Sequence, residues 1–268
     1  MTDEVSLEQA ALVVYVASDQ FFDFWGEQLL RAYAVPVSDI EVFLESSKPK
    51  IILWPVTNHG IAPDAPVDAM QSQVREQTAL FARLSDISAQ GVPITRVSPD
   101  KVSVALPNGI ELATPNCWVE AQGPADQALA LYNAGPPVIG SIAFWPPELF
   151  TFDPRDAELR VHHNEMQMIG RARHLVFGPY LSLPAGRWRV AARFRCDNIG
   201  ASHGLRFEWG GLETFVSFDV TPGKGGRYEA VLETEWSQSQ QVECRVILTA
   251  SALEGWFAFD GAEVQKLA

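Results

Sequence analysis

The sequence predicts a two-part α+β chain, with a small α/β region over residues 1–135 and an antiparallel, jelly-roll-like β-sandwich over residues 136–268. Three observations support this fold class. The first part combines short apolar runs with segments of helical periodicity. The second part contains runs of five to ten residues of alternating polarity, separated by Gly, Pro, Asn or Asp every 8–14 residues, as sandwich strands are. Gly135-Pro136-Pro137, a turn-forming sequence, lies between the two parts.

The first part opens with a predicted strand and helix. Leu12–Ala17 is short, apolar and rich in Val, which is typical of a buried strand. Ser18 and Asp19 are good N-cap residues, and Gln20–Tyr33 then has apolar residues at helical spacing. One long helix over residues 7–33 is the alternative, and we favour the strand followed by the helix. Ile51–Val56 predicts a second buried strand, whose Pro55 puts its end at an edge or a turn.

The clearest helix is Val67–Gln90, in which Met70, Val74 and Phe81 follow one face and Gly91 ends the helix. A strand over residues 94–97 follows. Asn108-Gly109 then joins two strand-like runs, at 102–106 and 110–113, and Asn-Gly between alternating runs is a strong hairpin signal. A short helix over residues 124–133 completes the first part.

The second part is predicted to contain strands only, because its pattern repeats every two residues between turn formers. The predicted strands are Ile139–Phe144, Met166–Arg171, His174–Phe177, Arg187–Cys196, Leu205–Trp209, Phe215–Val220, Arg227–Trp236, Gln241–Thr249 and Gly255–Val264.

Two of these strands carry opposite charges on one face. Alternate residues of a strand point the same way, so arginines share one face of residues 187–196 and glutamates share one face of residues 227–236. We expect the two rows to pair across strands as a salt-bridged outer face. The alternative is a ligand-binding arginine face, for which Arg189 and Arg193 are the candidates. The rows are Arg187, Arg189, Arg193 and Arg195, and Glu229, Glu233 and Glu235.

Three segments of the second part carry a resemblance to a known kind of module. They are Leu175–Tyr180 (LVFGPY), Leu183–Val190 (LPAGRWRV) and Gly255–Val264 (GWFAFDGAEV). Residues 170–267 resemble the β-sandwich modules associated with bacterial glycosyltransferases and surface-polysaccharide enzymes, which are similar in outline to carbohydrate-binding jelly rolls. The resemblance implies a jelly-roll-like fold and a carbohydrate-related role, but no fixed set of binding residues. Residues 1–135 resemble no family that we recognise.

The charge of the chain excludes some partners. The 33 acidic and 20 basic residues give a formal charge of −13, which disfavours both nucleic acid and anionic membrane surfaces. Most of that charge lies in residues 1–135, which hold 17 acidic and 7 basic residues. The near-neutral second part suits an uncharged ligand such as a glycan.

Other features of the sequence concern location. The N-terminus is acidic where a secretory signal would be basic, and the first apolar run is too short to span a bilayer. Cys117, Cys196 and Cys244 are too widely spaced for a disulfide framework or a zinc site. We therefore expect a cytoplasmic protein without membrane insertion, and the resemblance of residues 170–267 implies a bacterial one.

Three motifs are interpreted as loops. Gly200–Gly204 (GASHG) matches G-x-S-x-G, but a strand instead of a helix is predicted after it and no His occurs beyond His203. Gly223–Gly226 (GKGG) lacks the spacing of a phosphate loop and is predicted to form a hairpin turn. His162 and His163 would face opposite sides of a strand, so they would not share a metal ion. No metal and no cofactor are expected.

One catalytic constellation is conceivable. Asp19 follows the first predicted strand, and Asn58 and His59 follow the second. If these strands are parallel, the three residues lie at the carboxyl edge, where open α/β sheets place their ligands. Asp19 could then orient His59 as a general base. A helix cap and a turn explain the same residues.

The tryptophans of the second part are the candidates for sugar binding, because a flat aromatic ring suits the C–H face of a sugar. Trp145, Trp209 and Trp256 are the candidates, and Trp145 and Trp256 have the best prospect of exposure. Trp188 and Trp236 fall on the apolar face of their strands and are expected in the core.

The leading hypothesis is a non-catalytic carbohydrate-related binding or accessory protein, in surface-polysaccharide biosynthesis. One alternative is a small carbohydrate- or acyl-modifying enzyme that uses Asp19, Asn58 and His59. The other is a structural or assembly protein that oligomerises, or binds a protein partner, through the helix at residues 67–90.

Overall fold

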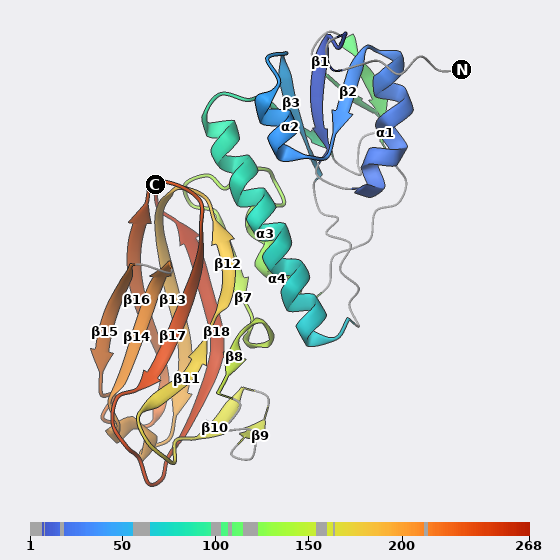
Figure 1. Cartoon of the computed structure of the whole chain (residues 1–268). Coiled ribbons are helices and arrows are strands. Elements are labelled where there is room, and N and C mark those ends of the chain that lie inside the picture. The colour runs from blue at the N-terminus through green and yellow to red at the C-terminus, as the bar shows by residue number, and fades with distance from the viewer. Residues whose placement is uncertain are drawn as a thin grey trace. The chain divides into compact units, whose positions relative to one another are not determined.

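The computed structural model describes residues 7, 9–16, 19–55, 65–97, 103–106, 109–114, 123–153, 160–162, 164–211 and 214–268, with only the backbone of residues 19, 20, 55 and 160–162. The chain forms two compact units (Figure 1). The first comprises residues 1–60, 84–121 and 132–136, and the second comprises residues 61–83, 122–131 and 137–268. The second unit thus draws two segments from before residue 135. A boundary at 135 between separately folding parts stays a prediction.

The first unit contains a four-stranded parallel sheet in the order β2-β1-β3-β4. Residues 12–16 form the strand β1, and the helix α1 begins only at Asp19. The alternative prediction of one long helix over residues 7–33 is therefore wrong. The strand β2 and the helix α2 were not predicted. Asp39 caps α2, since its side chain accepts the backbone N–H groups of Glu41 and Val42. The bounds are β1 Leu12–Val16, α1 Asp19–Arg31, β2 Ala34–Val37, α2 Ile40–Glu45, β3 Lys50–Pro55, α3 Val67–Ala89 and β4 Ile94–Val97.

The core of the first unit is apolar, and its two large indoles are hydrogen-bonded. The Trp25 indole donates to the carbonyl of Ala113, and the Trp54 indole donates to the carbonyl of Tyr132, each at 2.8 Å. The strands β5 (Ser103–Ala105) and β6 (Glu111–Ala113) pair antiparallel. The predicted hairpin is therefore confirmed, although Asn108 lies outside the described residues.

The second unit is a jelly-roll-like β-sandwich of two antiparallel sheets (Figure 1). Sheet I has the order β16-β13-β18-β10-β9, with β7 also paired to β18: β7 Ile142–Trp145, β9 Arg160–His162, β10 Glu165–Gln167, β13 Gly186–Cys196, β16 Gly226–Trp236 and β18 Trp256–Lys266. Sheet II has the order β15-β14-β17-β11-β8, with β12 also paired to β17: β8 Thr151–Phe152, β11 Arg173–Phe177, β12 Pro179–Leu183, β14 Leu205–Gly211, β15 Phe215–Val220 and β17 Gln240–Leu248.

All nine predicted strands of the sandwich exist, while β8, β9 and β12 were not predicted. The short helix predicted at 124–133 is α4 (Pro124–Leu129) followed by a 3₁₀ turn (Ala130–Tyr132). The hairpin predicted at Gly223–Gly226 is wrong, because β15 belongs to sheet II and β16 to sheet I. The turn therefore carries the chain from one sheet to the other.

The sandwich core forms where the inner faces of the two sheets meet. Trp188 and Phe194 alternate along β13 with arginines and are at most 2% exposed. The Phe194 ring lies 4.9 Å from that of Phe207 in sheet II, and the Trp236 ring lies 6.2 Å from that of Trp209. These aromatic contacts join the sheets.

The first part of α3 packs against sheet II. The guanidinium of Arg75 donates to the carbonyl of Pro179 at 2.9 Å and lies over the Tyr180 ring, while the hydroxyl of Thr78 accepts the backbone N–H of Ser182. Met70 and Val74 of α3 are buried, whereas Val67 at its start is 44% exposed. Oligomerisation or partner binding through this helix stays a prediction. Among the described helices, none has the length and apolar character needed to cross a membrane.

Candidate ligand pocket around Trp256

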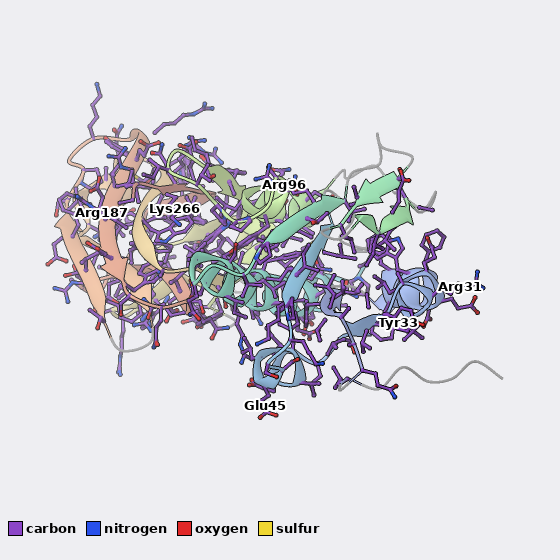
Figure 2. The ribbon with its side chains drawn as sticks, turned by 90° about the horizontal axis from the view of Figure 1, so that it is seen from above. Arg31, Tyr33, Glu45, Arg96, Arg187 and Lys266 are labelled. Atoms are coloured by element: carbon purple, nitrogen blue, oxygen red, sulfur yellow. The ribbon has the colours of Figure 1, made fainter. Side chains whose placement is uncertain are left out.

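The arginine and glutamate rows pair as predicted. In the β13–β16 register Arg189 lies opposite Glu233, and Arg193 lies opposite Glu229. Two nitrogens of Arg189 donate to one oxygen of Glu233, at 2.9 and 2.8 Å, and Arg187 donates to the other at 2.7 Å. These two guanidinium groups lower the pKa of Glu233. Arg187, at the start of the row, lies on the sandwich surface (Figure 2).

The two arginines proposed as ligand contacts are thus engaged by neighbouring carboxylates. Arg193 donates to Glu263 at 2.8 Å and to Glu229 at 3.3 Å. Each exposed pair of this kind contributes little to stability, about 0–1 kcal/mol. The face is a network in which both guanidinium groups already have carboxylate partners, and the ligand-binding arginine face stays a prediction.

At the end of β13 the same face opens into a pocket of about 390 Å³, here called the Trp256 pocket. Three chain segments build it: the end of β10, the turn after β13 and the loop that enters β18. Its lining residues are Glu165, Gln167, Ile169, Asp197, Ile199, Glu254, Gly255 and Trp256.

Backbone hydrogen bonds hold these three segments together. One oxygen of Asp197 accepts the N–H groups of Gly200 at 2.7 Å and of Trp256 at 3.0 Å, which ties the turn to the start of β18. The N–H of Met168 donates to the carbonyl of Gly255 at 2.8 Å, which ties β10 to the same loop. The frame is therefore fixed without any ligand.

Two glycines make this close packing possible. Gly255 has φ +107°, and a Cβ there would lie 2.7 Å from the backbone nitrogen of Gly200. A Cβ on Gly200 would lie 2.5 Å from the carbonyl oxygen of Trp256. Only a pair of residues without side chains lets the two loops touch in this way.

The pocket presents one aromatic ring among polar groups. Trp256 is partly exposed, and Gln167 lies directly opposite it in the β10–β18 register, so their side chains share the outer face. Ile169 and Ile199 are 40% and 42% exposed at the same place. An aromatic face beside an amide and carboxylates can stack on a flat apolar surface and hydrogen-bond groups at its edge.

Two other predicted tryptophans lie in the core. Trp145 is 1% exposed and Trp209 is fully buried, with ring centroids 5.8 Å apart. Trp145, which had a better prospect of exposure than Trp209, is buried, because β7 pairs with β18 and its indole packs against Trp209 of the other sheet. Of the three candidates, Trp256 alone presents surface to solvent. No spacing in the sequence related it to Gln167, Asp197 or Ile199, which come from distant segments.

The catalytic candidates are only partly described. Asn58 and His59 lie outside the described residues, and the structure describes the backbone of Asp19, at the start of α1, but not its side chain. The catalytic hypothesis required the first two predicted strands to be parallel, and β1 and β3 are parallel neighbours.

The segment that matches G-x-S-x-G forms a loop, as predicted. Gly200–Ser202 forms a 3₁₀ turn followed by β14, with no helix after it. Among the described residues no group of three His, Cys, Asp or Glu side chains could hold a metal ion, and His163 lies outside them.

A second pocket of about 550 Å³ lies at the other end of β16, and its lining includes Glu235 and Trp236.

Comparison with known proteins finds no matching family model and no matching curated protein. Among solved structures, the chain is similar to TmCBM61 in complex with β-1,4-galactotriose, at 9% identity and a TM-score of 0.31, over 44% of this chain and 86% of that one. It is also similar to a carbohydrate-binding module of Cellvibrio mixtus lichenase 5A in complex with cellotriose (14% identity, TM-score 0.23, 39% of this chain and 71% of that one).

A third match is a family 16 carbohydrate-binding module, at 12% identity and a TM-score of 0.28, over 47% of this chain and 86% of that one. Such values assign neither a family nor a ligand. These three structures are carbohydrate-binding modules.

Proposed function

We propose that this protein is a non-catalytic glycan-binding or accessory protein, and that the Trp256 pocket is its binding site. The observation that carries the proposal is the partly exposed indole of Trp256 beside the amide of Gln167 in an open, preformed pocket. A sugar ring has an apolar C–H face and a rim of hydroxyl groups, and this arrangement offers a partner to each.

A glycan array followed by titration calorimetry tests the proposal. Trp256→Ala should weaken the binding of any array hit at least tenfold, which corresponds to about 1.4 kcal/mol. Phe218→Ala is the matched control, because Phe218 is an exposed aromatic (49%) on β15 of the other sheet, and this variant should bind normally. The proposal fails if no glycan binds, or if Trp256→Ala binds as the parent protein does.

A role in surface-polysaccharide biosynthesis in the bacterial cytoplasm is the finer part of the proposal. It rests on the sequence resemblance of residues 170–267 and not on the pocket. Glycosyltransferase genes beside the gene for this chain would support the role. Unchanged surface polysaccharide in a deletion strain would contradict it.

The parallel sheet of the first unit supports a second candidate, a carbohydrate- or acyl-modifying enzyme. In the sheet order β2-β1-β3-β4, β2 lies on one side of β1 and β3 on the other, so the order of the strands reverses between β1 and β3. Open α/β sheets bind their ligands at the carboxyl ends of the strands at such a point. Asp19 follows β1 in sequence, and Asn58 and His59 follow β3. Loss of a hydrolytic or transfer activity in a folded His59→Ala variant would favour the enzyme, and an activity unchanged by that substitution would exclude it.

A further inference from the structure

We infer that the Trp256 pocket selects glycans by charge: it favours sugars that carry a protonated amino group and rejects sugars that carry carboxylate, sulfate or phosphate. The inference rests on the proposed function, since it concerns the ligand of the same pocket. It follows from three features of the lining: the sign of its charges, the hydrogen-bonding groups left free, and the exposed indole.

The charges at the pocket are negative. Glu165, Asp197 and Glu254 line it, and no Lys, Arg or His is among its described lining residues. The cation next to it, Arg195, is already engaged: it donates from two nitrogens to Asp260, at 2.8 to 3.1 Å, and to Glu165 at 3.1 Å. An anionic ligand would therefore meet carboxylates without a free guanidinium to bind it.

The free hydrogen-bonding groups are mainly acceptors. Asp197 uses one carboxylate oxygen for the N–H groups of Gly200 and Trp256, which leaves the other for a ligand. The Glu254 side chain is exposed at the rim, and its carbonyl oxygen lies 3.0 Å from a ring nitrogen of His203. Acceptors need donors, and an ammonium group offers three of them together with a positive charge, whereas a carboxylate offers none.

The aromatic ring favours the same ligand. A cation over the face of an indole is attracted by its electron density, and a partly exposed Trp256 among carboxylates combines both attractions. A neutral sugar keeps the stacking contact and hydroxyl donors but lacks the charge term. The expected order of affinity is amino sugar, neutral sugar, acidic sugar.

Three tetrasaccharides on one β-1,4-linked gluco backbone test this order by calorimetry on the full chain: glucosamine, glucose and glucuronic acid. At about pH 6 the amine is largely protonated and carboxylates near their ordinary pKa are ionised. We expect the glucosamine tetramer to bind at least tenfold more tightly than the glucose tetramer, and the glucuronic acid tetramer not to bind. Raising NaCl from about 20 mM to about 300 mM should reduce the difference, because salt screens the charges.

Two variants assign the effect to the pocket. Glu254→Gln keeps the shape and removes one charge, so the preference for the amine should fall several-fold. Glu235→Gln removes an exposed carboxylate at the other end of β16 and should leave the preference unchanged.

The outcomes separate the two claims. Glucuronic acid binding as tightly as glucose, or an amine preference that survives Glu254→Gln in full, overturns the charge selection while the glycan site stands. If none of the three tetramers binds, a glycan array decides: an acidic glycan as the strongest hit overturns the charge selection, and an array without hits overturns the proposed function itself.

Discussion

Gly255→Ala tests whether the contact between the two glycine loops holds the pocket together. A Cβ at residue 255 would lie 2.7 Å from the nitrogen and 2.9 Å from the Cα of Gly200, which are backbone atoms and not the end of a flexible side chain. The turn at residues 200–202 would therefore have to move away from the start of β18. Gly223→Ala is the matched control, since Gly223 also has a positive φ, +78°, and nothing lies within 4 Å of its Cβ position.

The two substitutions differ in expected cost. A left-handed backbone costs an alanine about 1–2 kcal/mol, and this is the whole expected effect of Gly223→Ala. Moving the 200–202 turn also weakens the bonds from Gly200 and Trp256 to Asp197, and one bond to a charged group contributes about 1.5–3 kcal/mol. Gly255→Ala should therefore lower the free energy of unfolding by about 3 kcal/mol or more.

Urea unfolding followed by tryptophan fluorescence measures both costs, and calorimetry with a glycan ligand measures the pocket. We expect Gly255→Ala to lose more stability than Gly223→Ala and also to lose affinity, while Gly223→Ala keeps its affinity. Equal losses of stability in the two variants would refute the reasoning, because backbone strain alone would then account for both.

Three further predictions concern the rest of the chain. The lowered pKa of Glu233 means that its stabilising effect is full above the unfolded value, about 4.3, and is lost as the pH falls through the lower folded value. Glu233→Gln should therefore flatten the fall in unfolding free energy between about pH 5 and pH 3, and an unchanged slope would contradict this. Burial raises the pKa of the Cys244 thiol to about 12, so iodoacetamide at about pH 8 should alkylate it only in denaturant, as site-resolved mass spectrometry would show. Arg75→Ala should destabilise the sandwich unit by about 1–2 kcal/mol in urea unfolding, because it removes a hydrogen bond and a cation–π contact, and an unchanged free energy of unfolding would contradict this.

The sandwich was predictable wherever a strand carries its own two-residue signal. In β13 and β16 the polar face carries a row of charges of one sign. The bounds of each strand, the direction in which its side chains point and its pairing partner could therefore all be derived. In contrast β12 (Pro179–Leu183) begins with a proline and is short, and its partner β17 lies about sixty residues away. The assignment of β12 as a strand depends on its hydrogen bonds to β17, which the local sequence does not predict.

Turns and sites were harder to predict for a related reason. Gly223–Gly226 has the composition of a hairpin turn, but the same residues suit a connection between sheets, and only the pairing of β15 and β16 elsewhere decides. Trp145 is the last residue of β7 and stands before two prolines, and only the pairing of β7 with β18 shows that its indole is buried. The Trp256 pocket combines residues from three segments, and the periodicity within each segment does not predict that the three lie close together in the fold.

The docking of α3 on sheet II has a consequence for synthesis on the ribosome. Arg75 and its acceptor Pro179 are 104 residues apart, and translation adds about 5–20 residues per second, so the helix emerges about 5–20 s before the strand that covers it. During that interval Arg75 and Thr78 lack their hydrogen-bond partners on β12. The first part of α3 therefore waits without these contacts until the second half of the chain is made, and an incomplete chain of this kind is prone to aggregate.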